Sequence, residues 1–291
     1  MTEQLIGVTG ATGGIGGRVA ARLAAAGVAQ RLIVRDAARA PELDGAEVRA
    51  APGGYGAAGQ FAAALEGVHT LLLVSAAEAP DRLEQHRSAV GAAAAAGVRH
   101  LVYVSFLGAA EHATFTLARD HHHTEAAIRD AGLPFTFLRD SLYLDFVPGL
   151  VGPDGVLRGP AGKGQVGAVA RDDVADAAVA VLTGSGHEGR TYDLTGPEAF
   201  TLADAAELMA DHSGKPIAFH NEALQEAFES RMDPEVPDFM IDAWVTTYLA
   251  IKEGEFATVS TAVKDLTGRD PVGLREILDR YPGSLDHVRS T

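Results

Sequence analysis

The sequence predicts an α/β chain with a doubly wound, parallel sheet and a smaller, mostly helical C-terminal lobe. Over the first half, short apolar runs alternate with alanine-rich helical stretches, the order typical of βαβ units. After about Ser141 the sequence becomes rich in Gly and Pro, and longer helical stretches follow. We therefore expect two domains, residues 1–150 and residues 151–291, with some segments of the second returning to the sheet.

Each element of this fold is expected from a local pattern. Six strands are predicted from short apolar runs at Leu5–Thr9, Arg31–Val34, Ala46–Ala50, Thr70–Ser75, Val98–Ser105 and Phe135–Leu138. Helices are predicted between them at Ile15–Ala26, Phe61–Leu65, Leu83–Ala96 and Asp120–Ala131. In the second half we expect a loop or hairpin over Gly152–Gly164, a strand at Arg190–Leu194, helices capped by Asp172 and Thr201, and a largely helical Glu222–Phe256.

Composition excludes several classes of function. The 291 residues include 24 Lys and Arg against 39 Asp and Glu, and the net charge of -15 repels nucleic acid backbones. The longest apolar stretches, such as Val68–Ala77, are too short to span a membrane, and no signal sequence precedes the first strand, so we expect a cytoplasmic protein. Because the chain has no Cys, any redox chemistry must come from a cofactor.

A glycine-rich loop follows the first strand directly and opens the first helix. It consists of Gly10, Ala11, Thr12, Gly13, Gly14, Ile15 and Gly16. Glycines at these positions allow a tight turn and a close approach of the backbone to a pyrophosphate, whose charge is favoured at a helix N-terminus. The alternative is an ordinary glycine-rich turn. Its place between strand and helix in a βαβ series favours a dinucleotide-binding loop.

The choice of dinucleotide depends on the end of the second strand, Val34-Arg35-Asp36. Arg35 comes first after the strand, and Arg39 lies one helical turn further, so two guanidiniums could pair with the 2'-phosphate of NADP. Asp36 could instead accept a hydrogen bond from the ribose 2'-hydroxyl of NAD. We favour NADP(H) and leave NAD(H) open as the less favoured cofactor.

Several blocks, in order along most of the chain, resemble the NmrA-like atypical short-chain dehydrogenases. They are TGATGGIGG (Thr9–Gly17), VRD (Val34–Asp36), LEGVHTLLLVS (Leu65–Ser75), AAGVRHLVYVS (Ala95–Ser105), HHHTEAAIRDAGLPFTFLRD (His121–Asp140) and VARDDVADAAVAVL (Val169–Leu182). HEGRTYDLTGP and a late DLTGRDP make the chain most similar to the branch of type 2 quinone oxidoreductases and triphenylmethane reductases.

The resemblance implies a Rossmann domain that carries a smaller lobe, with NADP(H) and a substrate in the cleft between them. It implies that Gly10–Ile15 hold the pyrophosphate, Arg35 the 2'-phosphate, and Ser75 and Ala76 the adenosine and ribose. It also places Ser105 and Phe106 beside the nicotinamide and Tyr143 in the substrate cleft. One departure concerns Gly54, which stands where the family usually carries an Asp that meets the adenine.

The proton donor of ordinary short-chain dehydrogenases is missing. Leu117 and His121 stand where their Tyr-x-x-x-Lys pair would be. A quinone-like acceptor fits this absence, because its oxygens can take protons from water after hydride transfer. His121 is the candidate catalytic residue, since a histidine near its ordinary pKa can donate a proton at neutral pH; His122 and His123 point elsewhere on the helix.

The sequence thus predicts an NADPH-dependent reductase that passes hydride to a quinone or a related conjugated small molecule. A non-catalytic redox sensor that binds the dinucleotide and acts through a protein partner is the alternative. A metal site at Asp120, His121, His123 and Glu125 is not expected, because two ligands on one helix do not close a site. Neither nucleic acid nor membrane is an expected partner, and a homodimer is left open.

Overall fold

The computed structural model describes residues 4–289, which divide into two compact units. Unit 1 comprises the described residues up to Ala109, together with Asp120–Asp140 and Asp172–Asp193. Unit 2 comprises Ala110–Arg119, Ser141–Arg171 and the described residues from Leu194 onward. The chain therefore crosses between the units several times; from the sequence we expected a boundary at residue 150 with some later segments returning to the sheet.

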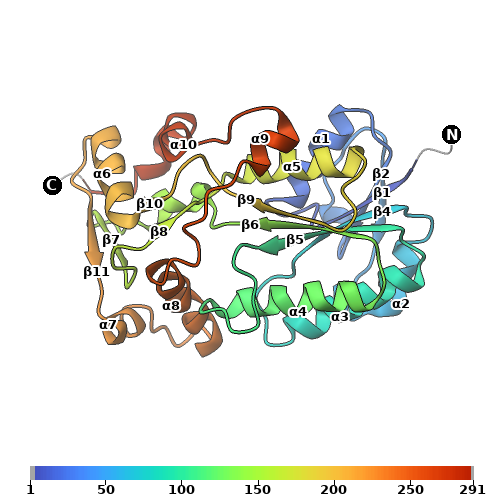
Figure 1. Cartoon of the computed structure of the whole chain (residues 1–291), viewed down its shortest axis with the longest axis horizontal. Helices are drawn as coiled ribbons and strands as arrows, with labels where there is room; N and C mark the ends of the chain where they lie inside the picture. The colour runs from blue at the N-terminus through green and yellow to red at the C-terminus, as the bar shows by residue number, and fades with distance from the viewer. Residues whose placement is uncertain (1–3, 290–291) are drawn as a thin grey trace. The chain divides into compact units, whose positions relative to one another are not determined.

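Unit 1 is built on a seven-stranded sheet in the order β3-β2-β1-β4-β5-β6-β9 (Figure 1). Its strands are β1 (Ile6–Thr9), β2 (Gln30–Val34), β3 (Ala46–Ala50), β4 (Thr70–Val74), β5 (His100–Phe106), β6 (Phe135–Asp140) and β9 (Arg190–Leu194). The pairs from β3 through to β6 are all parallel. This confirms the predicted doubly wound sheet. The strand expected at Arg190–Leu194 joins it as β9, beside β6.

Helices cover both faces of this sheet. They are α1 (Gly16–Ala25), α2 (Ala58–Ala64), α3 (Arg82–Ala95), α4 (Thr116–Asp130) and α5 (Arg171–Thr183), with short 3-10 turns η1 (Ala37–Arg39) and η2 (Gly54–Gly56). Figure 1 shows α1 and α5 on one face and α2, α3 and α4 on the other. Because both faces are covered, β4 and β5 are buried over nearly their whole length. Phe61 of α2, Ile128 of α4 and Tyr103 of β5 belong to one core cluster.

One helix prediction needs correction, and a second stretch, predicted as largely helical, is resolved into separate helices. Asp172 does not cap α5, because the helix already begins at Arg171. Its carboxylate instead forms ion pairs with Arg18 and Arg22 of α1. Arg22 also forms an ion pair with Asp176. The stretch Glu222–Phe256 contains two helices, α7 (Leu224–Glu229) and α8 (Asp238–Lys252). Proline cannot continue a helix, and Pro237 stands directly before α8.

Unit 2 is mostly helical with two small sheets. Its elements also include η3 (Leu144–Leu150), β7 (Val156–Gly159), β8 (Gln165–Val166), β10 (Phe200–Thr201), α6 (Leu202–Ser213), β11 (Ala218–Asn221), α9 (Ala262–Thr267), α10 (Leu274–Arg280) and η4 (Pro282–Leu285). Thr201 caps α6 as predicted, in a reciprocal pair with Asp204. The Gly- and Pro-rich stretch contributes β7, which pairs with β11 in parallel. Across residues 4–289, no helix combines the length and apolarity needed to cross a bilayer.

Candidate functional site

A pocket of about 480 Å³ lies in unit 1 at the carboxyl ends of β1, β2, β3 and β4. Its position is where the strand order reverses, between β1 and β4, which is where open α/β sheets bind ligands. The wall comes from the residues after each strand: Thr9–Thr12, Ile33–Arg35, Ala51–Gly56 and Val74–Ala77, with Phe61, Ala79, Asp81 and Gln85.

The glycine loop forms one side of this pocket and joins it to α1. Gly10 has a φ of +65°, a conformation that favours glycine. A Cβ on Gly16 would press into the carbonyl oxygens of Thr9 and Gly10, so only glycine lets α1 begin this close to β1. Gly10, Ala11 and Thr12 line the pocket, whereas Gly13, Gly14 and Ile15 continue away from it to the helix.

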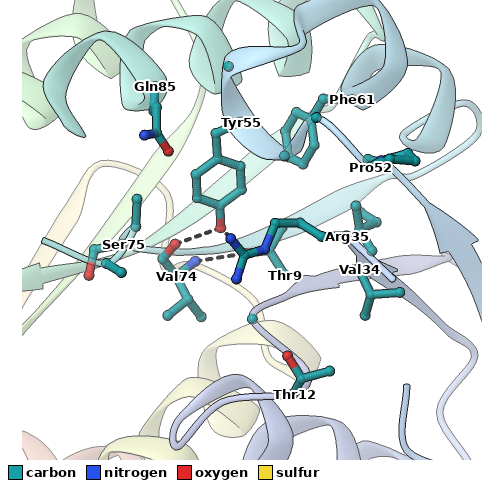
Figure 2. A pocket seen from close by; sticks show the side chains of 18 of the residues that line it. Thr9, Thr12, Val34, Arg35, Pro52, Tyr55, Phe61, Val74, Ser75 and Gln85 are labelled. Atoms are coloured by element: carbon teal, nitrogen blue, oxygen red, sulfur yellow. Dashed lines mark hydrogen bonds between the residues drawn. The ribbon is translucent and has the colours of Figure 1, made fainter. Parts of the chain in front are cut away.

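Arg35 is the cation of the pocket wall (Figure 2). Its side chain is exposed, and within residues 4–289 it forms neither a hydrogen bond nor an ion pair. The neighbouring Asp36 does not line the pocket, because its carboxylate accepts from the backbone N–H of Ala38 at 3.0 Å and so caps η1. Arg39 is also outside the wall. Among residues 4–289, the pocket wall thus offers the guanidinium of Arg35 to an anion.

Tyr55 lines the pocket, although no sequence pattern indicated it as a site residue. Its hydroxyl donates to the carbonyl oxygen of Val74 at 2.6 Å and lies 2.7 Å from Thr9 Oγ1, as Figure 2 shows. Thr9 Oγ1 also accepts from the N–H of Val74 at 2.9 Å. Burial raises the pKa of Tyr55 well above its ordinary value, so the hydroxyl stays protonated. Tyr55 therefore ties the ends of β1 and β4 together at the pocket.

The loop after β4 is held from behind by buried side chains of α3. The N–H of Ala76 donates to His86 Nε2 at 2.8 Å, and the carbonyl oxygen of Ala76 accepts from Arg82 Nε at 2.9 Å. Both side chains are buried, and Ser75 and Ala76 face the pocket as wall residues. The structure thus brings these two predicted residues together with the glycine loop and Arg35.

His121 belongs to the same buried group and is not part of the pocket wall. Arg82 Nη2 donates to its Nε2 at 3.0 Å, which leaves the proton on Nδ1, 2.9 Å from the hydroxyl of Tyr103. Burial, reinforced by the charge of Arg82, lowers the pKa of His121 well below its ordinary value. Both ring nitrogens of the neutral His121 imidazole are therefore engaged in hydrogen bonds within the protein. This geometry gives no support to the prediction that His121 donates a proton or contacts the nicotinamide ribose.

The remaining predicted residues also lie outside the pocket wall. Ser105 is fully buried, and its hydroxyl donates to Glu125 Oε1 at 2.7 Å. The same carboxylate is held by Arg139 at 2.7 Å, and Phe106 stacks at a tilt on His121 with 6.0 Å between ring centroids. Tyr143 belongs to unit 2, where its ring lies 5.8 Å from that of Phe146. Their predicted contacts with cofactor and substrate stay predictions.

A model of the family described as NAD(P)H-binding matches residues 10–185, more than half of the chain. The chain belongs to the NAD(P)H-binding, NmrA-like family. The matched range begins at Gly10 and takes in the whole pocket wall from there on. Because its curated relatives include a quinone oxidoreductase of Escherichia coli, 32% identical over 94% of this chain, and other named reductases, the NmrA-like protein is an NAD(P)H-dependent oxidoreductase.

Similar proteins include a (4-alkanoyl-5-oxo-2,5-dihydrofuran-3-yl)methyl phosphate reductase of Streptomyces griseus subsp. griseus, 38% identical over 91% of this chain and 93% of that protein. Among solved structures, the NADPH complex of the NADPH-dependent quinone oxidoreductase of Escherichia coli matches the NmrA-like protein with a TM-score of 0.87 and 32% identity, covering 94% and 99% of the two chains. The NADP(H) complex of the triphenylmethane reductase of Citrobacter sp. matches with a TM-score of 0.85 and 33% identity, covering 94% and 99%.

Proposed function

We propose that this protein is an NADPH-dependent reductase that transfers hydride to a quinone or a similar conjugated small molecule. The observation that carries the cofactor choice is Arg35, a guanidinium at the pocket wall with no ion-pair partner among residues 4–289. The reactions named for the relatives support the class of acceptor, since quinones, triphenylmethane dyes and a butenolide phosphate all contain conjugated systems.

The residues of the pocket fit NADP(H). Gly10 lines the pocket, and Gly16 lets α1 begin against the end of β1, so a pyrophosphate held by the loop would lie near the N-terminus of α1. The first turn of that helix contains no acidic residue. Arg35 would bind the 2'-phosphate, because a guanidinium forms charge-assisted hydrogen bonds with phosphate oxygens. Ser75 and Ala76 would contact the adenosine and its ribose. When bound, the reduced dinucleotide supplies the hydride.

The protonation states around the pocket favour an acceptor that needs no protein acid. Burial raises the pKa of Tyr55 and lowers the pKa values of His86 and His121, so none of the three is a proton donor suited to neutral pH. A quinone that takes up a hydride becomes the hydroquinone monoanion, and one proton from water then gives the hydroquinone and leaves hydroxide. The chain's task is to hold the two reactants together. That the acceptor binds between the two lobes, against Tyr143, stays part of this proposal.

The test compares Arg35→Ala with Arg39→Ala, a nearby arginine outside the pocket wall. We expect Arg35→Ala to raise the Kd of NADPH by about tenfold or more, because a charge-assisted contact contributes about 1.5–3 kcal/mol, and to leave NADH binding nearly unchanged. Arg39→Ala should leave both constants unchanged. Tighter binding of NADH than NADPH by the unmodified protein would overturn the cofactor assignment.

The same preparations are then assayed for NADPH oxidation with a small panel of quinones, against a blank without enzyme. Saturable turnover above the blank supports the reductase. Tight NADPH binding without reduction of any acceptor would contradict it and favour the redox sensor, which needs differential binding of the two redox states and no turnover.

A further inference from the structure

We propose that Arg82 and His86 are positioning residues for the cofactor: they fix the Ala76 peptide, and with it the wall of the pocket formed by the loop between β4 and α3. This inference rests on the proposed placement of NADP(H) in the pocket of unit 1. Neither side chain contacts the pocket itself, so their effect on the cofactor acts through the loop.

The loop has little structure of its own to hold it in place. Residues 75–81 are neither helix nor strand, yet five of them, Ser75, Ala76, Ala77, Ala79 and Asp81, line the pocket. Ala76 is held through both polar groups of its backbone, the N–H by His86 Nε2 and the carbonyl oxygen by Arg82 Nε. The two hydrogen bonds hold the two peptide groups that flank the Ala76 Cα, and with them the distance of this backbone from α3. A shift of these peptide groups would move the neighbouring wall residues Ser75 and Ala77.

His86 can hold the N–H of Ala76 only as a neutral imidazole with its proton on Nδ1. His86 Nδ1–H then donates to Thr124 Oγ1 at 2.8 Å, and the Thr124 hydroxyl donates to the carbonyl oxygen of Asp120 at 2.7 Å. The chain of donors therefore runs in one direction, from the Ala76 peptide to α4. Burial, together with the charge of Arg82, lowers the pKa of His86 to about 3 and keeps Nε2 an acceptor at neutral pH.

Each nitrogen of the Arg82 guanidinium donates to a different residue. Besides Ala76, it donates to Asp120 Oδ2 at 3.1 Å and to His121 Nε2 at 3.0 Å, both on α4. His121 is held in turn by Tyr103 of β5. A planar fork with fixed angles can satisfy these partners together, whereas a single ammonium cannot. His121 thus contributes to the site by anchoring Arg82.

The experiment measures the Kd of NADPH by equilibrium titration and, separately, the free energy of unfolding by urea. The variants are His86→Leu, which removes the acceptor, His86→Gln, whose Oε1 can accept from the same N–H, and Arg82→Lys. The matched control is His100→Leu. His100 is also a buried histidine, and its Nε2 lies 2.8 Å from the hydroxyl of Thr136. It stands at the amino end of β5, whereas the pocket lies at the carboxyl ends of the strands.

We expect His86→Leu to raise the Kd of NADPH about tenfold, because a buried N–H left without an acceptor displaces the loop. His86→Gln should restore most of the affinity, and Arg82→Lys should weaken binding as well. His100→Leu should lose stability and keep the affinity of the unmodified protein. A purely structural role would give all of these variants the same affinity.

Wild-type NADPH affinity in folded His86→Leu and Arg82→Lys would overturn the inference; if His86→Leu fails to fold, Arg82→Lys alone decides. Arg35→Ala separates this result from a failure of the proposed function. If Arg35→Ala weakens binding and the α3 variants do not, only the positioning role is wrong. If Arg35→Ala also has no effect, the cofactor lies elsewhere and the inference falls with its placement.

Discussion

At the scale of single residues, the environment of Arg35 depends on the absence of a side chain at position 54. Gly54 adopts a φ of +58°, and a Cβ built on it would lie 3.4 Å from Arg35 Cδ. An acidic side chain at this position would reach the guanidinium, and a carboxylate beside Arg35 would compete with a 2'-phosphate. Glycine at position 54 therefore leaves the Arg35 guanidinium available to the 2'-phosphate that we propose it binds.

Two side chains of the same shape at position 54 are expected to weaken NADPH binding to different extents. Asp and Asn both tolerate a positive φ better than other residues, so Gly54→Asp and Gly54→Asn differ mainly in charge. We expect Gly54→Asp to raise the Kd of NADPH about tenfold above that of Gly54→Asn, and to change NADH binding little. Titrations with both cofactors measure this. Equal losses in the two variants would show that the backbone, and not the charge next to Arg35, is responsible.

At the scale of elements, β1, the glycine loop and α1 depend on one another, because Gly16 lets the helix start against the end of the strand. In Gly16→Ala, the new Cβ would meet the backbone oxygens of Thr9 and Gly10, which cannot rotate away. We expect a loss of about 2 kcal/mol or more of unfolding free energy, as overpacked sites show, together with loss of NADPH binding.

The control for this prediction is Gly91→Ala. Gly91 lies inside α3 with open space around the position of its Cβ, so alanine there should add about 0.5–1 kcal/mol of helix stability and leave NADPH binding unchanged. Urea unfolding and NADPH titration of the two variants check both statements. A Gly16→Ala variant as stable as the unmodified protein would mean that α1 can shift away from β1 without cost.

The same scale separates what the sequence could predict from what it could not. In unit 1, the strands, most helices and the glycine loop follow from local periodicity and from neighbours within a few positions, and they were predicted within a few residues of their observed bounds. The short strands β7, β8, β10 and β11 of unit 2 were not predicted. Tyr55 meets Thr9 across 46 positions, and Arg82 meets His121 across 39. No local pattern records such contacts. For this reason the sequence selected His121 as an isolated catalytic candidate and overlooked Tyr55, Arg82 and His86.

At the scale of the whole chain, each of the two units is built from segments that are not consecutive in the sequence. Residues 172–193 contribute most of α5 and β9 to unit 1, although they follow the Gly- and Pro-rich stretch. The high Gly and Pro content of that stretch indicated a lobe boundary. Composition cannot indicate which later strand pairs with β6, because that pairing depends on contacts between distant segments.

The buried neutral histidines predict how the stability of the chain depends on pH. Burial lowers the pKa of His86 to about 3 and also lowers the pKa values of His100 and His121, whereas all three return to about 6.5 in the unfolded chain. The unfolded state therefore binds more protons between these values. The stabilisation is fully present above about pH 6.5 and is lost as the pH falls towards the folded pKa.

We expect His86 to lower the unfolding free energy by about 1 kcal/mol per pH unit between about pH 6 and pH 5, and His100 and His121 to act in the same direction. His86→Gln removes one titrating group, so its slope should be smaller by about that amount. The lowered pKa of Asp172 acts mainly nearer its ordinary value of 3.8 and adds little in this window. Urea unfolding of both proteins at several pH values measures the two slopes. Identical slopes would mean that His86 binds a proton in the folded state, and a protonated Nε2 could not accept from Ala76.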